Sequence, residues 1–93
     1  QDDQMISPSA IAALGNCYVK KGDNEKGAET LVKAAQKANN DAVSPIFLLQ
    51  AGEVYEELGK ADKALELYKE IKDKYFNSPL YAEIDKYIKR VSK

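Results

Sequence analysis

Histidine and tryptophan are absent from the 93 residues, and cysteine occurs once. The lack of histidine removes the commonest general base and the commonest metal ligand of proteins. The single cysteine, Cys17, can form neither an intrachain disulfide nor a cysteine-rich zinc site. We therefore expect a protein that is not an enzyme and that holds no metal ion or cofactor.

An excess of one charge and a long apolar run are also lacking. The 14 Lys and Arg residues nearly balance the 15 Asp and Glu residues, so the formal net charge is −1. Nucleic-acid-binding proteins usually carry a strong basic excess, so that class is disfavoured. The longest apolar run covers residues 10–14, whereas a membrane-spanning helix needs about 20 consecutive apolar residues. We expect one small domain with no nucleic-acid partner and no direct membrane contact.

The chain begins at Gln1 and shows no basic segment followed by an apolar one, which would mark a signal peptide. We expect it to be a processed piece of a longer protein. One cysteine is compatible with oxidising and with reducing surroundings, so cysteine usage leaves the compartment open.

A pattern of residues recurs along the chain. The glycines and tyrosine of the first copy return 37 positions later in the second, as Gly15 and Gly52, Tyr18 and Tyr55, Gly22 and Gly59. The pair Ser7-Pro8 likewise returns as Ser44-Pro45 and again as Ser78-Pro79. A period of this length is typical of stacked helical hairpins.

Each copy predicts two helices. A serine followed by proline is a helix-start signal, because the hydroxyl caps free backbone N–H groups and proline is tolerated in the first turn. From Pro8, apolar residues fall at helical spacing until Gly22, a helix stop. Asp23 is expected to cap the second helix, which ends at residues 39–41.

The second copy repeats this arrangement, with a first helix ending at Gly59 and a second ending at Asn77. Ser78-Pro79 then opens a fifth helix that runs to Val91. No segment alternates apolar and polar residues convincingly, so the predicted fold class is all-α.

Glycine inside a helix costs about 0.5–1 kcal/mol relative to alanine, so it needs compensation. We expect the two helices of each hairpin to approach closely, with Gly15 facing Gly27 and Gly52 facing Ala64. This packing role explains the glycines without a ligand.

The combination of residues resembles the tetratricopeptide repeat. The first copy carries Leu14-Gly15, Tyr18, Gly22-Asp23, Leu31 and Ala34, and the second carries Ala51-Gly52, Tyr55, Gly59, Ala64, Tyr68 and Ile71. The pattern departs from the family at Gly27, where alanine is usual, and at Ile11 and Leu48, where an early tryptophan is usual. The resemblance implies a right-handed superhelical stack: repeat 1 at residues 7–43, repeat 2 at 44–77 and a C-terminal capping helix at 78–93.

A narrower resemblance concerns residues 51–60, 73–79 and 83–88. These stretches look like the C-terminal part of bacterial envelope proteins in which a membrane anchor precedes a periplasmic tetratricopeptide domain. The resemblance favours the periplasmic face of the inner membrane, with the cytoplasm as the alternative.

The resemblance also implies a concave groove that binds a peptide or a partner helix. The expected groove residues are Asn16, Val19, Ile46, Leu49, Glu53, Glu56, Leu80, Glu83 and Tyr87, with Ser9, Ala12 and Arg90 beside them. Chaperone-binding members of the family hold a C-terminal carboxylate with a clamp of basic residues and Asn. Only Asn16 matches this clamp, so a chaperone adaptor is not supported.

Two other features of the sequence are predicted to have no catalytic or ligand-binding role. Glu53, Glu56 and Glu57 form an acidic patch that we interpret as a solvated helix face, able to steer a basic partner. Cys17 is expected to be a small buried hydrophobic residue, the usual state of a free cysteine.

The predicted function is a non-enzymatic scaffold that binds a protein or peptide in the groove. The alternative is a structural module that spaces or oligomerises a larger repeat protein and leaves the groove empty. Residues 10–14 are too apolar for a helix exposed on both flanks, so we expect this face to meet another hairpin or a second copy, giving a possible homo-oligomer through the first helix.

Overall fold

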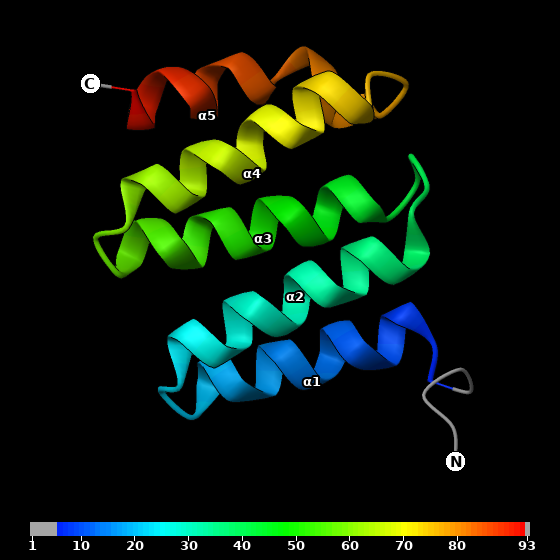
Figure 1. Ribbon diagram of the computed structural model, residues 1–93, viewed down its shortest axis with the longest axis vertical. Coiled ribbons are helices and arrows are strands. Elements are labelled where there is room, and N and C mark those ends of the chain that lie inside the picture. The colour runs from blue at the N-terminus through cyan, green and yellow to red at the C-terminus, as the bar shows by residue number, and fades with distance from the viewer. Residues whose placement is uncertain (1–5, 93) are drawn as a thin grey trace.

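The computed structural model describes residues 6–92, which fold into α-helices and one short 3₁₀ helix without any strand. The helices are α1 (Pro8–Lys20), α2 (Asn24–Ala38), α3 (Ser44–Glu57), α4 (Ala61–Lys74) and α5 (Ile84–Val91), and the 3₁₀ helix η2 (Pro79–Ala82) precedes α5. Each helix packs beside the one before it, and the chain zigzags from α1 at one edge to α5 at the other (Figure 1). The result is a thin slab of 43 × 31 × 15 Å, which confirms the all-α prediction.

The start of α1 and the turns of the two hairpins form as the sequence predicts. The hydroxyl of Ser7 accepts a hydrogen bond of 3.1 Å from the N–H of Ala10. Gly22 and Gly59 adopt φ angles of +92° and +77° directly after α1 and α3. Only glycine adopts this left-handed conformation at little cost, so both residues end their helices where the pattern places them.

The capping role predicted for Asp23 is wrong. Its side chain makes no capping hydrogen bond, and its backbone carbonyl accepts the N–H of Gly27 at 3.0 Å instead. The backbone of Asp23 has φ −92° and ψ 67°, which is outside the extended conformation that lets a side chain reach back to the first turn.

The capping role predicted for Ser44 is also wrong. The side-chain oxygen of Asn40 accepts the N–H groups of Ala42 and Val43 at 2.9 Å each, in the turn that leads into α3. The fully buried Ser44 hydroxyl donates to the carbonyl of Ala35 at 2.7 Å and accepts the N–H of Asn40 at 3.1 Å. Since Asn40 satisfies donors ahead of α3, Ser44 is free to join the end of α2 to the start of α3.

The C-terminal half is more broken than the sequence predicts. Helix α4 ends at Lys74 rather than Asn77, and the expected single helix after Ser78 is divided into η2 and α5. Ser78 does cap, because its hydroxyl accepts the N–H of Leu80 at 3.1 Å. The break re-aims the chain so that Ile84 packs into the core with 1% of its surface exposed.

The core runs along the middle of the slab. It is built mainly from small and medium apolar residues of consecutive helices: Ala12, Ala28, Leu31, Ala34, Ala35, Leu48, Ala51, Tyr55, Ala64, Leu67, Tyr68, Ile71, Tyr75 and Ile84. Alanine at so many contact positions lets neighbouring helices approach closely. The stack therefore holds its shape through contacts between successive helices, as repeat folds do.

Candidate functional site

The close approach predicted in the first hairpin is confirmed. A Cβ added to Gly15 would lie 3.0 Å from the carbonyl oxygen of Gly27, and one added to Gly27 would lie 2.8 Å from the carbonyl oxygen of Gly15. A methyl of Val19 also occupies the space beside Gly27. The two backbones leave no room for side chains here, which explains why positions 15 and 27 are both glycine.

In the second hairpin the glycine is packed against a side chain instead of a backbone. The atoms nearest to a Cβ on Gly52 all belong to the ring of Tyr68, with its Cζ at 2.9 Å. The prediction that Gly52 faces Ala64 is therefore wrong, because the residue that Gly52 faces is Tyr68. Gly52 makes room for an aromatic ring that is fully buried between α3 and its neighbours.

The predicted groove residues do not all take the same role. Asn16, Ile46, Glu53 and Glu83 are exposed, whereas Val19, Leu49, Glu56, Leu80 and Tyr87 are half-buried. Val19 contributes to the contact with Gly27, and Leu49 and Tyr87 pack against the core. The exposed members are therefore the ones available to a partner without repacking.

Glu56 is the centre of a hydrogen-bonded cluster that joins three helices. The hydroxyl of Tyr68 on α4 donates to one carboxylate oxygen at 2.6 Å. Arg90 on α5 donates to both oxygens, from Nη2 at 2.6 Å and from Nε at 2.9 Å. The guanidinium also lies over the ring of Tyr87, 5.0 Å from its centroid, and the rings of Tyr68 and Tyr87 are 5.5 Å apart.

This geometry shifts the ionisation of the cluster. The hydrogen bonds from Arg90 lower the pKa of Glu56, and the bond from Tyr68 acts in the same direction. Burial raises the pKa of Tyr68, and the hydrogen bond to the carboxylate raises it further. Glu56 is therefore held as a carboxylate and Tyr68 as a neutral phenol. The interpretation of Glu56 as part of a solvated face is wrong, because its charge is used inside the fold.

Part of the predicted groove forms a depression in the surface. Glu53, Glu56 and Glu57 of α3 and Arg90 of α5 line a depression of about 440 Å³. Glu53 and Glu57 are exposed, so they give the depression free carboxylates beside the compensated pair. This is where the structure brings predicted groove residues of different helices together.

The hydrogen bonds between Glu56 and Arg90 could hardly be predicted from the sequence. The two residues are 34 positions apart, and the sequence places both merely on helix faces expected to border one groove. The spacing of Tyr87 and Arg90, three residues apart on one helix, does indicate that they share a face. Which residue of α3 Arg90 contacts depends on how α5 packs on α3 and α4.

Cys17 is exposed, so the prediction that it is buried is wrong. It lies on the outer side of α1, away from the Gly15 face that packs on α2. Within residues 6–92, no group of three or more His, Cys, Asp or Glu residues is placed to hold a metal ion. No helix in that range is both long and apolar enough to span a bilayer.

Comparison with protein-family models matches residues 47–78 to a family described as Tetratricopeptide repeat. The matched residues comprise most of α3, the turn after it and all of α4. The resemblance predicted for the second copy is thereby confirmed, and no enzyme family is matched. No curated protein and no solved structure matches the chain. The resemblance to envelope proteins stays a prediction.

Proposed function

With a tetratricopeptide repeat at residues 47–78, we propose that this chain is a non-enzymatic scaffold that binds a protein or peptide partner in a groove across α1, α3 and α5. The first hairpin, residues 7–43, would be a second repeat of the same kind. The observation that carries the proposal is the depression between α3 and α5, where exposed carboxylates adjoin a rigid, internally compensated cluster.

The chemistry of that depression favours a basic partner. Arg90 already neutralises Glu56, which leaves Glu53 and Glu57 without a compensating cation in the described part of the chain. Ile46 is 43% exposed and lies on the same helix about 10 Å from Glu53, so an apolar contact is available two turns from the charges. A peptide with an apolar residue at about that distance from a Lys or Arg fits this arrangement, and preformed helices reduce the ordering cost of binding.

A site-specific photo-crosslinker tests this proposal. We would place it at Ile46 in one variant and at Lys69, an exposed residue of α4, in a matched control. The proposal expects a discrete partner captured from extracts of the source organism at position 46 and not at 69. The capture should be lost when Glu53 and Glu57 are changed to Lys. Equal capture at both positions, or none at 46, contradicts it.

The second candidate function is oligomerisation with no ligand in the groove, and the apolar residues of α1 favour it. Leu14 is 49% exposed although it lies on a packed helix. Light scattering over a concentration series distinguishes the two functions. Self-association that is abolished by Leu14→Asp favours assembly, whereas a monomer that still captures its partner through position 46 favours recognition.

For location, we propose the bacterial cell envelope, on the periplasmic side. The support is the resemblance of residues 51–60, 73–79 and 83–88 to envelope proteins. Immunodetection of the parent protein after separating membrane, periplasmic and cytoplasmic fractions is the test. Detection in the cytoplasmic fraction alone contradicts the proposed location and leaves the scaffold function untouched.

A further inference from the structure

A second surface, at the α1 edge of the slab, has the properties of a docking site. Residues of α1 and α2 line a groove of about 590 Å³, which we call the α1–α2 groove; its lining includes Ile11, Leu14 and Tyr18 of α1 and Lys26, Lys33 and Lys37 of α2. It does not share a residue with the groove of the proposed function. The two surfaces are therefore independent.

The repeat itself indicates that this face should be covered. The apolar positions Ile11, Leu14 and Tyr18 correspond, 37 residues on, to Leu48, Ala51 and Tyr55. In α3, which packs between α2 and α4, these three equivalents are 0%, 0% and 5% exposed. Helix α1 has α2 as its principal neighbour, and Leu14 is 49% exposed. The same face that is closed in the second repeat is thus open in the first.

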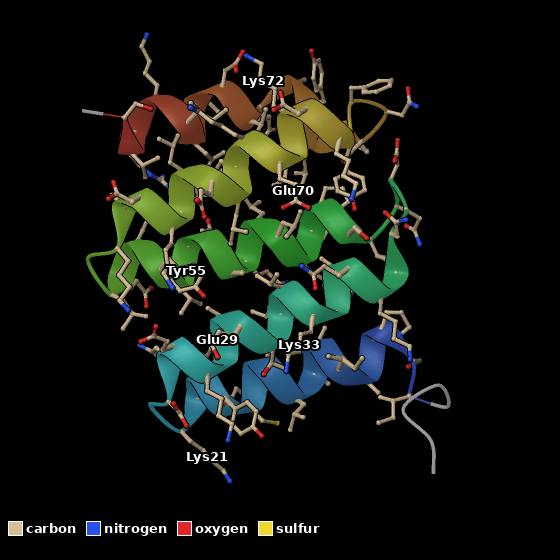
Figure 2. The ribbon with its side chains drawn as sticks, viewed as in Figure 1. Lys21, Glu29, Lys33, Tyr55, Glu70 and Lys72 are labelled. Carbon is tan, nitrogen blue, oxygen red and sulfur yellow. The ribbon has the colours of Figure 1, made fainter. Side chains whose placement is uncertain are left out.

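The charge of the α1–α2 groove indicates which kind of partner binds there. On the α2 side the groove is bordered by Lys26, Lys33 and Lys37, and none of the groove's lining residues is acidic. Lys33 lies at the border between α2 and α1 (Figure 2). Lys26 lies over the ring of Tyr18, 4.8 Å from its centroid. Neither Lys26 nor Lys33 has an ion-pair partner within residues 6–92.

A second copy of this chain, docked with the same face, is disfavoured by this charge. Lys26 and Lys33 of both copies would enter one interface whose lining holds no acidic residue, and like charges that face each other oppose association. An acidic partner gains attraction from the same lysines.

We propose that the α1–α2 groove binds an amphipathic helix of another protein that carries Asp or Glu beside its apolar stripe. The apolar stripe covers Ile11, Leu14 and Tyr18, as neighbouring helices cover their equivalents in α3. The acidic side chains pair with Lys26 and Lys33. The lysine row from residue 26 to residue 37 is about 16 Å long, so the bound helix has roughly three to four turns.

Two designed peptides of about 14 residues test the proposal. Both are helix-stapled and carry Leu at every third or fourth position, and they differ in having Glu or Lys beside that stripe. Binding to the whole chain is followed by fluorescence anisotropy at low and high salt. The site is located by amide chemical-shift changes.

The Glu peptide should bind saturably, weaken with added salt, and shift the amides of α1 and α2. Leu14→Ala should weaken it about fivefold through lost apolar burial, and Lys33→Glu by about fivefold or more through charge reversal. The matched controls are Phe76→Ala, which removes an exposed apolar side chain beyond the end of α4, and Lys69→Glu on α4. Both controls should bind as the unaltered chain does.

Several results would overturn the proposal: no saturable binding of the Glu peptide, equal binding of the Lys peptide, or shifts confined to α3 and α5. Concentration-dependent self-association that Leu14→Ala abolishes would also overturn it, because a second copy would then cover the groove. All of these readouts leave Ile46 and Glu53 unaltered in the test variants, so the outcome does not depend on the proposed function.

Discussion

The phenol of Tyr68 donates a hydrogen bond of 2.6 Å to the carboxylate of Glu56, which Arg90 holds from its other side. The three residues come from α4, α3 and α5, so this cluster fixes the last helix on the hairpin of α3 and α4. Tyr68 is fully buried, whereas the side chain of Arg90 is 52% exposed. The two donors should therefore contribute unequally.

Tyr68→Phe should lower the free energy of unfolding by about 1.5–2 kcal/mol, since it removes a buried hydrogen bond to a charged group. Arg90→Gln should cost about 1 kcal/mol, because solvent screens an exposed partner. Urea denaturation of both single variants and the double variant gives their coupling. We expect the double variant to lose less than the sum, and strict additivity would show that the two donors do not act on one carboxylate.

Glu56 should make stability dependent on pH on the acid side. Because the native fold lowers the pKa of this carboxyl from its ordinary value of 4.5, its contribution is present above that value and is lost as the pH falls towards the native pKa. The stability difference between the unaltered chain and Glu56→Gln should therefore shrink between neutral pH and about pH 3. Thermal or urea unfolding across this range measures it.

The control for this pH dependence is Glu53→Gln, which changes an exposed carboxylate of the same helix. It removes one negative charge from α3 and leaves the hydrogen bonds among Tyr68, Glu56 and Arg90 in place, so it reports the effect of the lost charge alone. A Glu56→Gln curve that does not differ from the Glu53→Gln curve would contradict the assignment.

Gly27→Ala should destabilise the first hairpin. The new methyl would meet a methyl of Val19 and would lie 2.8 Å from the carbonyl oxygen of Gly15. Overpacking of this kind costs about 1–3 kcal/mol, which outweighs the gain of about 1 kcal/mol in helix propensity. Denaturant unfolding of Gly27→Ala and Gly15→Ala compares the two sites.

Gly15→Ala should cost less, because the atoms nearest to the new methyl lie at 3.0 Å, farther away than the Val19 methyl and the Gly15 carbonyl oxygen lie from a methyl at position 27. An increase in stability for Gly27→Ala would show that the helices can separate without loss.

The repeated Ser-Pro pairs should respond differently to the same substitution. Ser44→Ala should cost about 2 kcal/mol, because it removes a buried hydroxyl that bonds the Ala35 carbonyl and the Asn40 N–H. Ser7→Ala should cost about 0.5–1 kcal/mol, because it removes an exposed helix cap. Equal losses, measured by urea denaturation, would contradict the distinct roles of the two serines.

The sequence predicts the helical hairpins well because their signals are local. Gly22 and Gly59 end helices by a backbone conformation that few other residues adopt. Ser7 caps α1 by accepting a hydrogen bond from the N–H three residues further along the chain. The partner of Gly52 could not be predicted in the same way. Both Ala64 and Tyr68 lie one turn apart on α4, and the side chain that occupies the gap depends on the helix rotation.

The candidate sites were predictable in part. The sequence predicts Glu53, Glu56 and Glu57 as one acidic patch and places Arg90 beside the groove, and in the structure these four residues line one depression. The lysine row of the α1–α2 groove also follows a helical spacing. The apolar residues 10–14 already predict that a face of the first helix needs a partner, and the structure shows that the lysines border the groove on that face.

The sequence by itself determined the number and extent of most helices and the hairpin turns, because capping, glycine turns and apolar periodicity act over a few residues. The tertiary structure alone decided what Ser44, Cys17 and Glu56 do. The partners of Glu56 are Tyr68 and Arg90, which lie 12 and 34 positions away. The role of Ser44 depends on the end of the preceding helix, and the exposure of Cys17 depends on which side of α1 packs. Contacts of that kind arise from helix rotation and spacing, which local sequence signals do not fix.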